Sequence, residues 1–199
     1  NGTGEYPFVS YGYLLETGAG WHGSIGAAEI IVRLPYWVES ANVFLEGSPG
    51  WGGTTPDFEV DKNELIWTFE DFEPENKDNI SIALVWPSLW NQIKEQRSYV
   101  DDFPSDGEGW GRLAKLYKEA ARLRRGLRQD SGGRNLYKWS KEAYQKALVL
   151  LPDDALWHAG YGDLLSWNSM YTYMQTEQGR SDYIEALRQM YIGYLYDPQ

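Results

Sequence analysis

A motif that occurs twice, 46 residues apart, constrains the fold of this chain more than any other feature. Each copy spaces apolar residues by three or four positions, as on one face of a helix, and ends at a proline. The first copy consists of Ala143-Tyr144, Ala147-Leu148, Leu150 and Pro152, and the second of Ala186, Met190, Gly193-Tyr194, Tyr196 and Pro198. Aromatic-rich amphipathic segments precede both copies, at 110–127 and 156–174. Because repeated helix pairs stack and present a surface, the pattern favours binding over catalysis.

The first hundred residues lack this helical period and predict β structure. Short apolar or β-branched runs are separated by turn residues such as Gly47-Ser48-Pro49-Gly50 and Asp61-Lys62-Asn63. We expect strands at 6–15, 28–34, 43–46, 58–61, 65–72 and 80–86. Strands of this number and spacing are typical of a small, mostly antiparallel sandwich or open barrel.

From about Asp106 the apolar period changes to 3.6 residues, which predicts helices. Ser105 or Asp106 is expected to cap the first helix, Asp153 and Asp154 the third, and Ser181-Asp182 the fourth. The whole chain is therefore expected to be α+β. Its β domain should span 1–100, a linker 101–109, and two helical hairpins with about four helices 110–199.

The helical half resembles the tetratricopeptide repeat family. The matches to the family's two helices are Trp110, Leu113-Ala114 and Tyr117, then Tyr144, Ala147-Leu148, Leu150 and Pro152. A second unit matches at Tyr161-Gly162, Leu165, Ala186, Met190 and Pro198. The spacing of 46 residues departs from the family's unit of about 34. Two units are also fewer than the three that usually bury a stack, so something must cover the exposed ends.

This resemblance implies a binding groove, because the family's ligands lie against the inward face of each unit's first helix. The matched positions place six residues there: Lys115, Lys118, Glu119, Asp163, Ser166 and Trp167. We expect these residues to line one continuous concave surface that binds protein. Trp167 would supply an anchor of the kind that is enriched at interfaces.

The first half resembles uncharacterised exported bacterial proteins. The similar positions are the segment 11–26, Asp71-Phe72-Glu73-Pro74 and Asn79-Ile80. The resemblance implies a β fold and an extracytoplasmic location, whether secreted, periplasmic or on the cell surface. It implies no chemistry.

Charge is distributed unevenly along the chain, whose net charge is −11. Residues 1–104 carry −12, whereas 112–146 carry +8. We expect the basic helices of 112–146 to dock on the acidic β half, with Trp90, Ile93 and Tyr99 bridging the contact. Nucleic acid is not an expected partner, because the rest of the chain would repel phosphate. No apolar run reaches the roughly 20 residues of a membrane span.

The residues that could carry chemistry point to no catalytic, metal or cofactor site. Cysteine is absent, which removes disulfides and thiolate chemistry from this chain. His22 is interpreted as a loop residue and His158 as a packing residue on a helix. The carboxylates near the end of the long predicted strand are interpreted as a solvated acidic edge rather than a glycosidase pair; they are Glu70, Asp71, Glu73 and Glu75.

Tryptophan offers the main alternative to protein binding, because an exposed indole ring can stack on a sugar. Trp51 is the best candidate for such a ring, since it lies between Gly50 and Gly52 in a predicted turn. The favoured hypothesis is a non-enzymatic interaction or scaffold protein of an extracytoplasmic assembly, binding another protein or itself. The alternative is a module that binds carbohydrate or a surface polymer. A hydrolase that uses acidic residues comes third.

Overall fold

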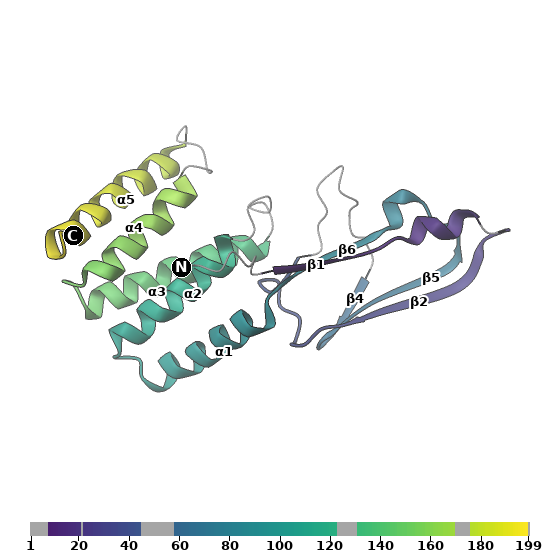
Figure 1. Ribbon diagram of the computed structural model, residues 1–199, viewed down its shortest axis with the longest axis horizontal. Helices are drawn as coiled ribbons and strands as arrows, with labels where there is room; N and C mark the ends of the chain where they lie inside the picture. Colours follow the sequence, from purple (N-terminus) through teal and green to yellow (C-terminus); the bar gives the residue numbers. More distant parts are fainter. Residues whose placement is uncertain (1–7, 21, 45–57, 123–130, 170–175, 199) are drawn as a thin grey trace. The chain divides into compact units, whose positions relative to one another are not determined.

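The computed structural model describes residues 8–20, 22–44, 58–122, 131–169 and 176–198 (Figure 1). Contacts divide the chain into two compact units, one that includes Asn1–Trp90 and one made of Asn91–Arg122 and Arg134–Gln199. The first unit holds the strands and the second holds most of the helical residues, which confirms the α+β class. Trp51, the candidate for sugar stacking, lies outside the described residues.

The described strands of the first unit form two antiparallel sheets of three strands each. One sheet has the order β1 (Phe8–Tyr13), β6 (Ile80–Val85), β3 (Val43–Phe44). The other has the order β2 (Ile25–Arg33), β5 (Glu64–Phe72), β4 (Phe58–Asp61). Two short 3₁₀ helices, η1 (Leu15–Gly20) and η2 (Asn76–Asp78), lie between strands. Every expected strand overlaps an observed one, although β2 begins earlier than expected because Ile25 and Ala27 pair with β5.

The pairing of β4 with β5 shows how local sequence positions these strands. Asp61 pairs with Glu64, so only two residues form the turn, and Lys62 has a φ of 53°. Such a positive φ suits the tight turns that join twisted strands. Along β5, Leu65 and Trp67 are fully buried while Thr68 and Glu70 are exposed. The alternation predicted for a half-buried strand is therefore confirmed.

The segment after β6 differs from the sequence-based expectation. Residues 87–100 were assigned to the β domain and 101–109 to a linker, but α1 spans Pro87–Asp102. Leu89, Ile93 and Val100 are buried on it at helical spacing, and proline is well suited to a first helical position. The contact division falls inside this helix, between Trp90 and Asn91. The chain thus has five described α-helices rather than about four.

Four further helices follow α1: α2 (Gly107–Arg122), α3 (Ser131–Leu150), α4 (Ala155–Ser169) and α5 (Glu177–Tyr196). α3 and α5 each have 20 residues. Their first residues are 46 positions apart, as are their last, so they match the spacing of the sequence motif. None of the helices in the described part of the chain combines the length and apolar character of a membrane span.

Two of the three predicted helix caps are confirmed. The carboxylate of Asp154 accepts a hydrogen bond from the Trp157 amide at 2.9 Å, at the start of α4. Asp106 immediately precedes α2, and its carboxylate accepts a hydrogen bond from the Gly109 amide. The third prediction is wrong, because α5 begins five residues before Asp182 and is capped by Thr176, which accepts from the Gly179 amide at 3.0 Å.

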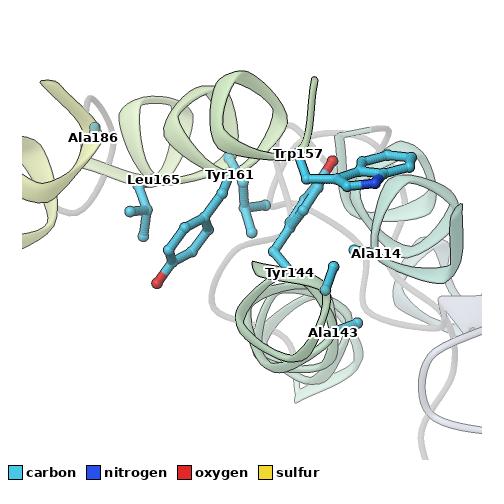
Figure 2. Packing of buried hydrophobic residues seen from close by; sticks show 9 residues of the cluster. Ala114, Ala143, Tyr144, Trp157, Tyr161, Leu165 and Ala186 are labelled. Carbon is cyan, nitrogen blue, oxygen red and sulfur yellow. The ribbon is translucent and has the colours of Figure 1, made fainter. Parts of the chain in front are cut away.

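The core of the helical unit gathers small and aromatic side chains from α2 to α5 (Figure 2). Ala114, Ala143 and Ala147 are almost completely buried and keep side-chain volume low where helices meet. The ring of Tyr144 packs between the rings of Trp157 and Tyr161, with centroid separations of 6.5 and 6.0 Å. Ala143 and Ala147 belong to the repeated motif, so the small residues of the motif lie at contacts between helices, as expected.

α4 and α5 approach closely at two glycines. A Cβ atom at Gly162 would lie 2.7 Å from Met190 Cγ and 2.9 Å from the Ala186 carbonyl oxygen. On the other helix, a Cβ atom at Gly193 would lie 3.0 Å from the Ala155 carbonyl oxygen. Any larger residue at either position would therefore push the helices apart.

α1 contacts the first helix pair. Arg97 Nε donates to the Tyr117 hydroxyl of α2 at 2.7 Å, and the guanidinium carbon lies 5.0 Å from the centroid of the Trp139 ring on α3. A guanidinium over an indole ring is a favourable cation–π arrangement. α1 therefore packs against α2 and α3. It covers part of the first helix pair, for which the sequence had predicted that some segment must cover an exposed end.

Candidate functional site

The groove expected from the sequence maps to α2 and α4. Lys115, Lys118 and Glu119 lie on α2, and Asp163, Ser166 and Trp167 on α4. We call these six residues the α2–α4 surface. Lys115 and Glu119 are exposed, whereas the other four are half-buried.

An ion pair joins the two helices at the centre of this surface. Lys118 Nζ lies 3.0 Å from Asp163 Oδ2 and also donates to the Gly160 carbonyl oxygen at 3.3 Å. The Lys118 ammonium lies 5.6 Å from the Tyr144 ring centroid, and its side chain is 13% exposed, against 41% for Asp163. The structure thus brings Lys118 and Asp163 together.

The remaining residues of the α2–α4 surface are placed by helical spacing. Trp167 follows Asp163 by four residues, so both lie on the same face of α4. On α2, Lys115 precedes Lys118 by three residues and Glu119 by four, so these three residues also share one face. Since Lys118 is already paired, Lys115 and Glu119 are the groups of α2 that a ligand would meet first.

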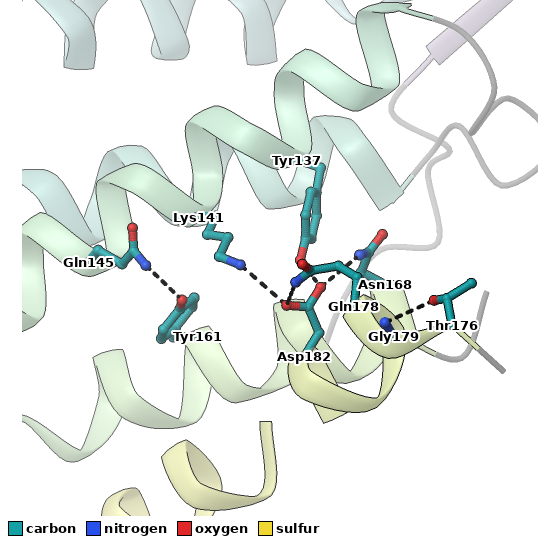
Figure 3. A network of polar contacts seen from close by, with 9 residues as sticks. All are labelled: Tyr137, Lys141, Gln145, Tyr161, Asn168, Thr176, Gln178, Gly179 and Asp182. Carbon is teal, nitrogen blue, oxygen red and sulfur yellow. Dashed lines mark hydrogen bonds and ion pairs between the residues drawn. The ribbon is translucent and has the colours of Figure 1, made fainter. Parts of the chain in front are cut away.

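A second polar cluster, which the sequence did not reveal, lies where α3, α4 and α5 meet (Figure 3). Its centre is Asp182, which is 5% exposed. The carboxylate accepts hydrogen bonds from four side chains: Gln178 at 2.9 Å, Lys141 at 3.3 Å, Tyr137 at 3.4 Å and Asn168 at 3.4 Å. We call these five residues the Asp182 network.

The buried position of the Asp182 network changes the pKa of its tyrosine, Tyr137. Burial, together with the nearby charge of Asp182, raises the pKa of the Tyr137 hydroxyl well above its usual range. Tyr137 therefore stays protonated and keeps donating to the carboxylate at neutral pH. A buried carboxylate with four donors is a stabilising junction, because its charge is fully hydrogen-bonded.

The sequence contained a usable signal for Asp182. It belongs to the row Gly179, Asp182, Ala186, Gln189 and Gly193, which α5 buries at three- and four-residue spacing. A polar residue in such a row requires buried partners. The cap interpretation missed this because it considered only the residues near Ser181.

An open cavity of about 870 Å³ adjoins the Asp182 network, between α3 and α5. Tyr161 of α4 contributes to its lining, together with Gln145 and Leu148 of α3 and Ile184 of α5. Gln145 donates to the Tyr161 hydroxyl at 3.1 Å, and burial raises the pKa of that hydroxyl. The cavity combines apolar walls with polar groups and could accept a side chain of a partner.

The two histidines have different surroundings. His22 is exposed in the β unit. His158 is buried, with Nδ1 at 2.5 Å from Gln189 Oε1 and Nε2 at 2.8 Å from the Pro152 carbonyl oxygen. The interpretation of His158 as a packing residue is confirmed, with the addition that both ring nitrogens are hydrogen-bonded.

The carboxylates at the predicted acidic edge are exposed to solvent. Glu70, Asp71, Glu73 and Glu75 are all exposed, and Glu75 pairs with Lys77 at 3.0 Å. Within the described ranges, no three or more His, Cys, Asp or Glu side chains come together as a set of metal ligands.

Of the residues expected to bridge the two halves, Trp90 and Tyr99 have ring contacts within their own units. Trp90 is buried and its ring lies 6.2 Å from that of Tyr36 in the β unit. Ile93 is fully buried. Tyr99 packs its ring 5.0 Å from that of Phe103, in the helical unit.

No protein-family model matches this chain, and no curated protein matches it.

Proposed function

We propose that this chain binds another protein non-covalently and serves as a scaffold component of an extracytoplasmic assembly. The observation that carries this proposal is the Lys118–Asp163 ion pair, 3.0 Å long, between the first helices of the two pairs. It holds α2 and α4 side by side and leaves Lys115 and Glu119 exposed next to it. A surface fixed in this way needs little ordering when a partner binds.

The chemistry of the α2–α4 surface suits a protein segment better than a small anion or a nucleic acid. It offers one exposed cation and one exposed anion on α2, together with the indole of Trp167 on α4. Tryptophan is enriched among residues that dominate binding energy, while charges at the rim favour the correct orientation. The expected partner therefore places an apolar side chain against Trp167 and polar groups over Lys115 and Glu119.

The extracytoplasmic part of the proposal is supported by the β unit. Its segment 11–26 resembles exported bacterial proteins.

Site-specific photo-crosslinking in the cells that produce the protein tests this function. A photoreactive residue at Glu119 should yield a discrete adduct, which should disappear when Trp167→Ala is introduced. The same photoreactive residue at Glu142, an exposed glutamate on α3, is the matched control and should yield no such adduct. Thermal unfolding of the Trp167→Ala variant must first show that the helical unit is intact. Equal adducts from both positions, or an adduct indifferent to Trp167→Ala, would contradict the proposal.

Carbohydrate binding by the β unit is a second candidate, favoured by one observation. Trp37 is 71% exposed, which is unusual for so large an apolar ring. An indole in this state can stack on a sugar ring. Titration of intrinsic tryptophan fluorescence with oligosaccharides should reveal a saturable change that Trp37→Ala removes. No change with any glycan would leave protein binding as the function.

A further inference from the structure

The outer side of α5 carries an apolar stripe that remains exposed. Its five members, which we call the α5 stripe, are Ile184, Leu187, Tyr191, Tyr194 and Leu195, with exposed fractions of 67%, 51%, 62%, 59% and 59%. They recur at intervals of three and four residues, so they form one continuous face of the helix. An isolated exposed apolar residue is ordinary, but a continuous row of five indicates a surface that meets a partner.

The stripe lies on a different side of α5 from its buried row. Ala186 and Gly193 lie on the buried side and contact α4. At about 100° per residue, the centre of the stripe lies about 130° around the helix from Ala186. Figure 1 shows α4 along one side of α5, with no further helix of the described chain along the other. α5 therefore has one side buried against α4 and a second, apolar side that the described chain leaves uncovered.

The area of the stripe reaches the size that an interface requires. With side chains of about 200 Å² each, the exposed fractions amount to roughly 600 Å² on one chain. Two such stripes packed together would bury up to roughly 1,200 Å², which is at the lower end of the range for specific interfaces.

The order of residues along the stripe is self-complementary. When two copies of α5 are placed antiparallel about a two-fold axis at the level of Gln189, Ile184 meets Tyr194 of the second copy. Leu187 then meets Tyr191 of the second copy, and each contact occurs twice by symmetry. In both of these contacts a branched aliphatic side chain faces an aromatic ring, and such alternation of sizes allows two helices to interdigitate.

The charges near the ends of the stripe agree with the same register. Arg180 lies on the stripe side near the start of α5, and Asp197 follows the last residue of the helix. Both are exposed. In the antiparallel arrangement, Arg180 lies opposite position 198 of the second copy, which is next to Asp197. The offset between Arg180 and Asp197 along the helix axis is therefore one residue, or about 1.5 Å. Opposite helix dipoles also favour this orientation.

We propose that a second copy of this chain covers the α5 stripe, with the two α5 helices antiparallel. This inference specifies one partner within the proposed binding function, on which it rests, but it uses a surface separate from the α2–α4 surface. An anionic membrane is a poorer occupant because the chain carries a net charge of −11 and such surfaces attract cationic helices. An interface of this modest size predicts a reversible dimer with a dissociation constant in the micromolar range.

Sedimentation equilibrium of the intact chain tests the proposal, at loading concentrations from about 1 to 200 μM, which bracket that affinity. Leu187→Asp would place two like charges at the centre of the interface and should weaken the dimer at least about 100-fold. Val149→Asp is the matched control, because Val149 is 81% exposed on α3, and it should leave the dimer unchanged. A wild-type chain that stays monomeric, or a dimer that survives Leu187→Asp, would overturn the proposal.

A charge exchange tests the register independently and does not alter the apolar contacts. Arg180→Asp and Asp197→Arg should each weaken the dimer about 3- to 10-fold, and the double variant should restore it, since the exposed pair is only reversed. A double variant as weak as the single variants would refute the antiparallel register. Because Trp167→Ala should not affect the dimer and Leu187→Asp should not affect the Glu119 adduct, either proposal can fail alone.

Discussion

The α2–α4 surface and the Asp182 network both join helices through an aspartate, but the two carboxylates have opposite surroundings. The Asp163 side chain is 41% exposed and meets one lysine, whereas that of Asp182 is 7% exposed and has four donors on three helices. A carboxylate of the first kind contributes little to folding and stays available to a ligand. One of the second kind cannot lose its partners without a large penalty. The difference separates a surface suited to binding from a junction that maintains the fold.

The largest effect is expected when the Asp182 carboxylate is removed. Asp182→Ala leaves Lys141 and three neutral donors without their acceptor, and should lower the free energy of unfolding by about 3–5 kcal/mol. Chemical denaturation followed by far-ultraviolet circular dichroism measures this loss. Asp182→Asn, which keeps the shape and one acceptor oxygen, should cost less. A loss below about 0.5 kcal/mol for Asp182→Ala would show that the network is not a stabilising junction.

A smaller loss is expected from crowding the contact between the helices. Ala147 is fully buried in the core of the helical unit. Ala147→Leu should therefore overpack the core and cost about 1–3 kcal/mol. Thermal unfolding of the variant, compared with Val149→Leu at an exposed position of the same helix, isolates the effect of burial. If Ala147→Leu melted like the wild type, the close approach inferred from the motif would be incorrect.

The ion pair of the α2–α4 surface should matter less for stability. Asp163→Asn is expected to change the free energy of unfolding by only about 0–1 kcal/mol, because the carboxylate is substantially exposed. A double-mutant cycle with Lys118→Met measures the coupling between the two side chains. A coupling above about 2 kcal/mol would place Asp163 in the same class as Asp182 and remove the contrast between the two regions.

The smallest effect concerns pH and a third carboxylate, Asp106, at the start of α2. Its hydrogen bond from the Tyr99 hydroxyl, followed by one from the Gly109 amide, lowers the pKa of Asp106. Because the folded pKa is depressed, the stabilisation is present above the unfolded value of about 3.9 and is lost as pH falls through the folded value. Denaturation between about pH 2 and 5 should show a shallower acid loss for Asp106→Asn than for the wild type. Asp101→Asn on α1 serves as the control, and identical profiles for all three proteins would contradict the prediction.

Local sequence patterns predicted most of the elements correctly. Alternation along 65–72 and the residues of the turn at 61–63 were sufficient to place β5 and its hairpin, because both depend on neighbouring residues. The 3.6-residue period did the same for α2 to α5. The sequence-based prediction missed α1, although Pro87 and the spacing of Leu89, Ile93 and Val100 indicate a helix. It was missed because the proline, glycine and acidic residues at 101–109 are typical of a linker.

The sequence by itself determined the α+β class, the 46-residue spacing of the helix pairs, and the identity of their close-approach residues, such as Ala147 and Gly162. These properties follow from periodicity and side-chain volume, which act over a few residues. Only the tertiary structure decided that Lys118 meets Asp163, that Asp182 is buried among four donors, and that the α5 stripe stays exposed. Each of these depends on which face of a helix turns toward a segment distant in the chain, and that choice is made when helices pack.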